Sequence, residues 1–596
     1  MSLLWWILFG FLAYWVALIS VSRAGFLPDS VRTQGPLITI HTTRGRAFLN
    51  RLSRHQRFWR AWGNLGLGIA LVIMLGMFLV VLNAAIASML SPEATAVTQP
   101  QNILVIPGIN EFLPLSVAPE IVFGLLVGLV VHEGGHGLLC RVEDIEIESM
   151  GVVMLAIIPF GAFVQPDEKT QRMADRGGKS RMFAAGVMNN FAITIIVFAL
   201  LFAMVGAMIV PAGGAAVGQA LAGSPAGEAG IDSGDRIVAI EDETIDRNED
   251  LESVLRESSE REIRVELADR DPVTVERSLF APVAIPGGPS GIEPGDHIER
   301  VNGEEIYTTT ALHDRLADEP LVTVETTDGS EHTFPAGAHV AHVEPGDPLD
   351  RAGAPSGTID LVITAMDGER VTSAADAREI LTDTEPGQEI DLEIYDVTDR
   401  PDDPEPTTYT VELGEHDEGY GFLGVILQPG VTGVQFDDFG AQLYPTERFL
   451  ATLGGETEES SLFGLDTFFG KIFSAMVLPI AALFGTGFEQ NFAGFTGHVA
   501  NFYEVQGIFA GAPWIVFITA NALFWTGWIN FNLGIFNCIP AFPLDGGHLL
   551  RASAEAVVSR LPISDRYVAV KYVTVSVGLA MLAGLVLMIF GQGILA

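Results

Sequence analysis

The stretch IVFGLLVGLVVHEGGHGLLC, residues 121–140, sets two histidines and a glutamate in a run that is otherwise apolar and long enough to cross a membrane. His132 and His136 are four residues apart, so on a helix they share one face and can both bind one metal ion. Glu133 lies beside them as a candidate general base. Because charge at membrane depth is costly and usually functional, the stretch predicts a metal site within the bilayer or at its edge.

Further apolar runs predict a polytopic α-helical membrane protein with about six spans. The run Phe468–Phe488 is also long enough to cross, but Lys471 and Pro479 interrupt it, so we expect a seventh, re-entrant or interfacial segment there. The six expected spans are Leu3–Val21, Leu65–Leu90, Ile121–Cys140, Phe183–Val210, Trp514–Ile539 and Tyr567–Phe590.

Basic residues predict the direction of these spans, because loops rich in arginine and lysine stay on the cytoplasmic side. The segment 22–60 holds eight arginines against one acidic residue, whereas 91–118 has no basic residue. Further basic groups lie within 169–181 and 550–566. We therefore expect a cell-membrane protein with HEGGH near the cytoplasmic face and with the region 211–430 outside the cytoplasm.

The overall composition is acidic, with a formal net charge of -41 and only four lysines. An acidic, lysine-poor soluble surface is typical of halophilic proteins, because high salt screens the repulsion between like charges. The same composition argues against nucleic-acid binding, which needs a basic face. Only Cys140 and Cys538 are present, each in or beside an apolar run, which excludes a disulfide framework.

Between residues 215 and 428 the chain becomes acidic and strand-like, and it repeats. Each repeat passes from a Gly/Pro/Asp turn into an alternating strand and then a polar hairpin tip. The repeats are SPAGEAGIDSGDRIVAIEDETI (224–245), GIEPGDHIERVNGEEI (291–306) and GDPLDRAGAPSGTIDLVITAMDGERV (346–371). They resemble PDZ modules of the kind attached to proteases, although the second lacks a convincing leading half. The resemblance implies an extracytoplasmic α+β region that either binds peptide termini by strand addition or acts only as a steric filter or spacer.

A catalytic zinc ion usually takes three protein ligands and leaves one position for water. The best third ligand is Asp545, in NCIPAFPLDGGH (537–548), where a lone carboxylate follows a long apolar run. His548 is the second candidate, although an isolated histidine of this kind is more often a capping or interfacial residue. Bound zinc would lower the pKa of its water toward ~7, and Glu133 could take that proton and pass it to a leaving amine. The constellation therefore predicts peptide-bond hydrolysis.

Four motifs together resemble the site-2 protease family of intramembrane zinc metalloproteases. They are HEGGH, GAFV at 161–164, AAGVMNNF at 184–191 and NCIPAFPLDGGH at 537–548. The resemblance covers about 119–211 and 510–592, and the composition adds an expected origin in a halophilic archaeon. It implies that Zn²⁺ is bound by His132, His136 and Asp545, and that Glu133 is the catalytic acid and base.

Two asparagines are softer expectations from the same resemblance. Many members carry a G-P-x-x-N motif whose asparagine lies near the substrate, and Asn190 fits it, although Val187 replaces the proline. The alternative for Asn190 is a helix-packing amide. Asn537 matches a family asparagine that holds the substrate or the oxyanion, and its alternative is a buried helix-end side chain bonded to backbone.

The segment VEDIEIESMGVVMLAIIPFGAFVQP, residues 142–166, alternates in part and is too irregular for a clean span. It resembles the membrane-inserted β hairpin of the family. Irregular backbone at membrane depth is tolerated only against protein or a water-filled cavity. The hairpin edge could pair with an unwound substrate strand, and unwinding is needed because helical hydrogen bonds shield the peptide bonds of a transmembrane substrate.

The chain is therefore expected to divide into six parts. They are a two-helix membrane extension (1–118), the first part of the catalytic core (119–211), a first PDZ-like unit (212–282), a second PDZ-like unit with a partial repeat at its start (283–430), an amphipathic or re-entrant linker (431–509) and the second part of the core (510–596).

The favoured function is an intramembrane zinc metalloprotease that cuts a single-pass membrane protein near the cytoplasmic face. The alternative is a catalytically silent membrane scaffold or receptor that binds peptides through its PDZ-like units, although a pure scaffold has no need of Glu133. A metal transporter is weaker still, because it predicts ionisable residues along several spans, whereas here they cluster at one depth.

Overall fold

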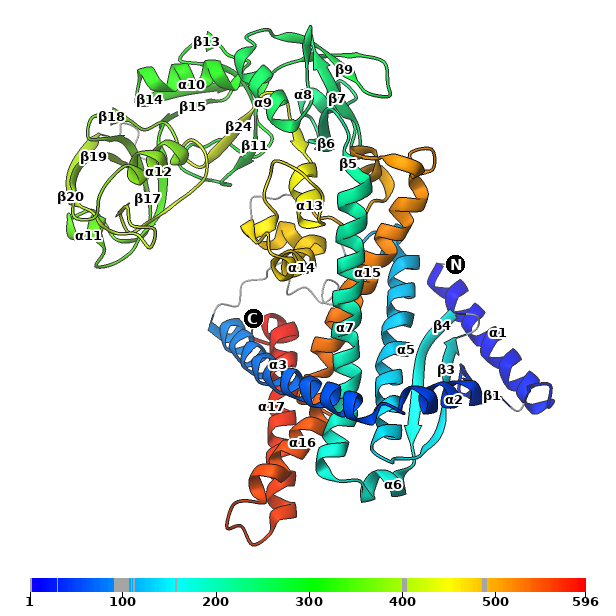
Figure 1. The fold of residues 1–596 in the computed structure, drawn as a ribbon. Coiled ribbons are helices and arrows are strands. Elements are labelled where there is room, and N and C mark those ends of the chain that lie inside the picture. Colours follow the sequence, from blue (N-terminus) through cyan, green and yellow to red (C-terminus); the bar gives the residue numbers. More distant parts are fainter. Residues whose placement is uncertain are drawn as a thin grey trace. The chain divides into compact units, whose positions relative to one another are not determined.

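A computed structural model of the chain describes residues 3–28, 30–90, 107–108, 110, 113–155, 158–398, 405–484 and 490–595. The chain forms two compact units (Figure 1). The membrane unit comprises Met1–Pro211 and Glu447–Ala596, and the inserted unit comprises Ala212–Thr446.

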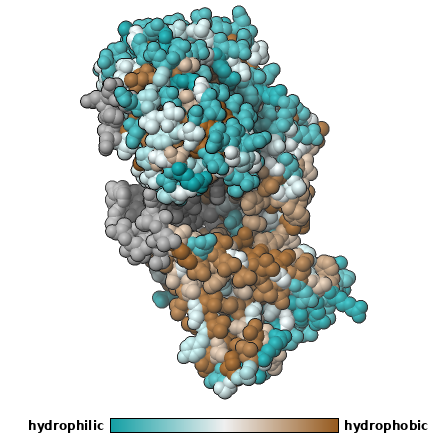
Figure 2. Space-filling view, turned by 90° about the vertical axis from the view of Figure 1, so that its left-hand side faces the viewer, coloured by the Kyte–Doolittle hydropathy of each residue, from teal (hydrophilic) through white to brown (hydrophobic). Residues whose placement is uncertain are grey.

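Five helices of the membrane unit are long and apolar enough to cross a bilayer, within the part of the chain that the structure describes. Hydrophobic side chains gather over these helices, and hydrophilic ones over the inserted sheets (Figure 2). The five helices are α3 (Gln56–Leu90), α5 (Ala118–Val142), α7 (Arg176–Met208), α15 (Pro513–Asn537) and α17 (Arg566–Leu595). They correspond to the second through sixth spans expected from the sequence.

The first expected span lies in α1 (Leu3–Arg23), a helix of 21 residues. Whether α1 crosses the membrane as a sixth span stays a prediction. The segment expected to be re-entrant forms α14 (Phe468–Val477) and then a 3₁₀ helix, Leu478–Phe484, whose geometry breaks at Ile480. Both helices are too short to span, which fits a re-entrant or interfacial segment, although 485–488 lie outside the described residues.

Helices α5, α7 and α15 pack closely against one another through glycines. A Cβ on Gly124 of α5 would lie 2.9 Å from the carbonyl oxygen of Trp525 on α15, and one on Gly527 of α15 would lie against the ring of Phe198 on α7. Small residues at such crossings let helix backbones approach. The remaining elements of this unit are α2 (Thr43–Leu52), α6 (Glu168–Met173), α13 (Thr446–Thr452), α16 (Asp545–Val558) and the paired strands β5 (Ile209–Pro211) and β26 (Tyr503–Val505).

A four-stranded antiparallel sheet lies beside α5. It is formed by β1 (Val31–Gln34), β2 (Leu37–His41), β3 (Ile147–Leu155) and β4 (Ile158–Pro166), in that order. The hairpin expected at 142–166 is thus present as β3 and β4. Two strands of the N-terminal extension, which were not expected, cover the edge of β3. They can do so because Gly151 has no side chain: a Cβ there would lie against the carbonyl oxygen of Ile40.

The inserted unit contains three six-stranded sheets with the same strand order. The first sheet is formed by β6 (Ala215–Ala220), β7 (Arg236–Ile240), β8 (Glu243–Thr244), β9 (Glu262–Leu267), β10 (Val273–Glu276) and β25 (Ala441–Leu443). The second is formed by β11 (Leu279–Ala284), β12 (His297–Val301), β13 (Glu304–Glu305), β14 (Leu321–Thr326), β15 (Glu331–Pro335) and β24 (Val434–Asp437). The third is formed by β16 (Ala338–Val343), β17 (Gly357–Met366), β18 (Glu369–Arg370), β19 (Glu389–Asp396), β20 (Pro406–Glu412) and β23 (Val425–Leu427).

Each sheet has its own apolar core and one helix packed into it. These helices are α9 (Asn248–Glu257), α10 (Thr309–Asp318) and α12 (Ala374–Thr382), and the shorter elements are α8 (Pro225–Glu228), α11 (Pro348–Arg351) and the pair β21 (Gly414–Glu415) and β22 (Gly421–Phe422). The third sheet is closed first, by β23, then the second by β24 and the first by β25. The three repeats are therefore nested.

The nesting corrects two of the boundaries expected from the sequence. The repeat expected to be partial forms a full sheet, because its leading strand is Leu279–Ala284 and its closing strand is Val434–Asp437. The expected linker 431–509 contains the closing strands of the first two sheets. Strands of three or four residues carry no readable alternation, and their partners lie more than a hundred residues away.

Candidate metal centre

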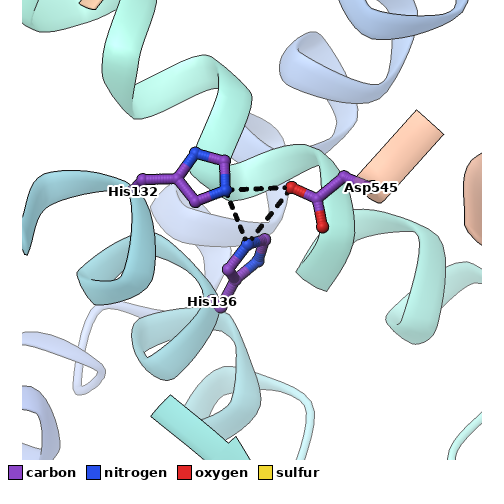
Figure 3. A group of neighbouring side chains, drawn as sticks. All are labelled: His132, His136 and Asp545. Atoms are coloured by element: carbon purple, nitrogen blue, oxygen red, sulfur yellow. Dashed lines mark hydrogen bonds and ion pairs between the residues drawn. The ribbon is translucent and has the colours of Figure 1, made fainter. Parts of the chain in front are cut away.

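Two helices of the membrane unit bring two histidines and one aspartate to a single point (Figure 3). His132 and His136 lie one turn apart on α5, and Asp545 is the first residue of α16. The Nε2 atoms of the two histidines are 3.1 Å apart. Asp545 Oδ2 lies 3.1 Å from Nε2 of His132 and 3.2 Å from Nε2 of His136. All three side chains are largely buried, and in such a site of low dielectric constant the charges of a carboxylate and a cation interact more strongly than in water.

The surroundings of the cluster fit a divalent cation. Nδ1 of His136 lies 2.8 Å from the carbonyl oxygen of Met182 on α7. Because a carbonyl only accepts, Nδ1 carries the proton and Nε2 directs a lone pair into the cluster. Lone pairs that converge in a buried site repel one another unless a cation lies between them. Nitrogen and carboxylate ligands in this number suit zinc, and a bound zinc ion would be held by these three residues.

Helix α7 packs directly against the imidazole rings of His132 and His136. A Cβ on Gly186 would lie 2.8 Å from Nε2 of both His132 and His136. Only glycine at this position leaves room for the rings and for an ion between them. This steric requirement explains the glycine at the first position of the G-P-x-x-N motif.

Asn190 of α7 is fully buried and contacts a metal-ligand candidate. Its Nδ2 lies 3.2 Å from Nδ1 of His132, while its Oδ1 has no hydrogen-bond partner among the described residues. A half-turn of the amide would direct Oδ1 toward a protonated Nδ1 and leave Nε2 of His132 free for a metal. In that orientation the donor on His132 and the acceptor on Asn190 are matched. Asn190 is thus positioned to orient His132.

Glu133 connects the metal helix with the membrane sheet. Its Oε2 accepts a hydrogen bond of 2.8 Å from the backbone N–H of Val164 on β4. Strand β4 is the last of the sheet and pairs with β3 on its other side. The candidate base therefore lies at the edge of β4 that no described strand covers.

Comparison with known proteins agrees with this geometry. The sequence profile of peptidase family M50 matches residues 120–585, which include His132, Glu133, His136 and Asp545. This chain belongs to peptidase family M50. The resemblance to the site-2 protease family is therefore confirmed. Family membership, together with five apolar helices, indicates a multi-pass membrane metalloprotease.

One relative of this M50 peptidase is an uncharacterized protein from Methanocaldococcus jannaschii. The two are 24% identical over 190 residues, which are 31% of this chain and 48% of the relative. The chain thus spans about half the length of the curated relative it matches. An archaeal relative fits the archaeal origin expected from composition.

Two further residues named from the M50-like motifs lie outside the ligand cluster. The ring of His548 stacks on Phe183 with centroids 4.2 Å apart, and it is not among the three clustered ligands found in the described residues. Asn537 donates from Nδ2 to the carbonyl oxygen of Leu533, 2.9 Å away, one helical turn earlier. This is the helix-end bond of the alternative interpretation, and a substrate role for Asn537 stays a prediction.

The N-terminal extension, which precedes the M50 match, makes a contact that sequence reasoning missed. Trp62 of α3 donates from Nε1 to Oδ1 of Asn189, 3.0 Å away, and Asn189 Nδ2 donates to the carbonyl oxygen of Val131, 3.3 Å away. Val131 directly precedes His132. A single tryptophan in an apolar helix gives no local signal of such a role.

Proposed function

We propose that this M50 peptidase is a zinc-dependent intramembrane protease that hydrolyses peptide bonds within the transmembrane segments of single-pass membrane proteins. The observation that carries the proposal is the convergence of three buried ligand atoms beside Glu133. Zinc, when bound there, would polarise a carbonyl and lower the pKa of a water. Glu133 would take a proton from the attacking water and deliver it to the leaving amide nitrogen.

The substrate segment would bind as an added strand along β4. The Val164 N–H points away from β3 and meets Glu133, so a strand added along this edge would run past the candidate base. Strand addition also exposes the peptide bonds of an unwound helix while satisfying their hydrogen bonds. Positively charged segments at 169–181 and 550–566 support a cytoplasmic location for this end of the bundle.

The inserted unit would act outside the cytoplasm as three PDZ-like modules. A cavity of 200 Å³ in the third module is lined by residues of α12 and of the closing strand β23, among them Arg378, Leu381, Val425 and Leu427. An edge strand beside a helix is the arrangement by which such modules bind extended peptides. This cavity supports peptide binding over the alternative of a purely steric filter.

The test is cleavage of a co-expressed single-pass reporter with a short external stub and a helix-breaking residue in its span. The native chain should release a small cytoplasmic fragment, and Glu133→Gln should reduce its release by about 10²–10⁴-fold, the usual contribution of a general base. Glu148→Gln, at an exposed position on β3, is the matched control and should cleave normally. Equal release by the Glu133→Gln variant would refute the proposed role of the base.

A silent scaffold is the second candidate, and the cavity of the third module is the observation that favours it. A scaffold would bind peptides through the inserted unit before and after zinc removal and would cleave none of them. Zinc at one ion per purified chain, lost together with cleavage on chelation, would exclude it.

A further inference from the structure

Two adjoining hollows of 820 and 470 Å³ lie between the start of α7, helix α16 and the start of α17. They share Arg176, Arg551, Glu555 and Tyr567. We call them together the basic cleft. The six cations that line it are Arg172, Arg176, Lys179, Arg551, Arg566 and Lys571.

The basic cleft is positively charged, whereas the protein as a whole is strongly acidic. The chain has a net charge of -41 and only four lysines, yet two of those lysines line this one cleft. Glu555 is the one acidic residue among its described lining residues. Membrane topology alone requires basic residues in the cytoplasmic loops, but it does not require their side chains to line one cleft.

The lining acid does not neutralise these cations. Glu555 is shared between Arg551, at 3.2 Å, and Arg176, at 4.0 Å, and Arg172 pairs with Glu168, at 3.0 Å. Lys179 donates to a backbone carbonyl oxygen, and neither Arg566 nor Lys571 has an ion pair among the residues that the structure describes. The basic cleft therefore keeps a net positive charge that an anionic ligand would offset.

The position of the cleft indicates which anion it meets. Helices α7 and α17, both apolar enough to cross the bilayer, begin at the cleft. Tyr567 and Phe542 line it with 71% and 52% of their surface exposed. Tyrosine side chains such as that of Tyr567 gather at the depth of lipid headgroups. Basic pockets between transmembrane helices at this depth are suited to lipid phosphates.

We propose that the basic cleft binds the phosphate of an anionic lipid headgroup, with Arg566 and Lys571 as its principal ligands. The lipid tails would lie along the apolar surface of α17. The proposal does not depend on peptidase activity, because the site shares none of its lining residues with the metal ligands.

The test titrates the purified full-length chain in detergent with phosphatidylglycerol or phosphatidylcholine and counts bound lipids by native mass spectrometry. Phosphatidylglycerol should bind more tightly, and the double variant Arg566→Gln/Lys571→Gln should weaken it on the order of 30-fold, at about fivefold per cation. Arg560→Gln is the matched control, since Arg560 is an exposed cation of the neighbouring loop between α16 and α17 that does not line the cleft. Folding of the double variant is checked by its zinc content. The double variant should fold, because removing cations from the first turns of α17 relieves an unfavourable charge at a helix N-terminus.

Equal affinity for the two lipids, or equal affinity of the double variant and the control, would overturn the proposal. A second arm adds inorganic phosphate without lipid and follows the thermal unfolding of the native chain. Stabilisation by millimolar phosphate that matches stabilisation by phosphatidylglycerol would assign the site to a soluble phosphate and refute the lipid source. Stabilisation by the lipid alone is the expected result.

Discussion

Each unit of the molecule buries a small cluster of charged groups, and the two clusters differ in how their polar atoms are matched. In the membrane unit, a ring nitrogen each of His132 and His136 and a carboxylate oxygen of Asp545 meet at one point, 3.1–3.2 Å apart, in the arrangement of a metal-ligand set. In the inserted unit, Arg277 and Asp438 are almost completely buried and pair at 2.8 Å. The first cluster is complete only with a cation, whereas the second is complete as it stands.

The Arg277–Asp438 cluster distributes its donors over matching acceptors. The guanidinium also donates to the carbonyl oxygens of Ser258 and Leu255, and the carboxylate also accepts from the backbone and hydroxyl of Thr309. Arg277 lies in the crossing from the first sheet to the second, and Asp438 in the crossing back. The pair therefore fastens two nested repeats together. Acceptors that converge on one point indicate a ligand site, whereas a buried ion pair whose donors and acceptors are all matched indicates a structural contact.

The largest expected effect is on the metal. Asp545→Asn should lower zinc affinity by more than the 10–100-fold typical of residues behind the ligands, because the amide has lost the negative charge that holds the cation. Zinc content of the purified chain measures this directly. His548→Asn is the matched control on the same helix and should keep its zinc. Zinc lost from His548→Asn and kept by Asp545→Asn would exchange their roles.

Breaking the Arg277–Asp438 pair should lower the stability of the inserted unit and leave the zinc content of the chain unchanged. Arg277→Met leaves Asp438 buried without its partner and should destabilise the inserted unit by about 3–5 kcal/mol. The double variant Arg277→Met/Asp438→Leu removes both charges and should recover much of that loss. Denaturant unfolding gives both values, and zinc content should stay at the native level. A single variant as stable as the native chain would show that the pair does not fasten the repeats.

The two clusters also differ in how far sequence could predict them. His132 and His136 follow from spacing alone, and Asp545 from the oddity of a carboxylate after an apolar run, so the structure brings together the three residues that the sequence singled out. The Arg277–Asp438 pair had no signal, because it depends on the nested closing strands. Residues 161 positions apart meet there only once three sheets have formed. The covering of β3 by the hairpin of β1 and β2 also had no sequence signal, because β2 pairs with residues far away along the chain.

The smallest expected effect is on zinc affinity when Asn190 is replaced. This effect shows which atom of the Asn190 amide faces His132. If its Oδ1 accepts from a protonated Nδ1 of His132, Asn190→Ala should lower zinc affinity about 10–100-fold, as removal of such partners generally does. Asn190→Asp retains the acceptor and should preserve most of the affinity, since carboxylate–histidine–metal arrangements are common. Competition with a chelator of known affinity measures both variants. Loss in Asn190→Asp equal to that in Asn190→Ala would mean that the NH₂ group faces His132. The tautomer of His132 would then leave Nε2 protonated, and the ligand set would have to be rebuilt around His136 and Asp545.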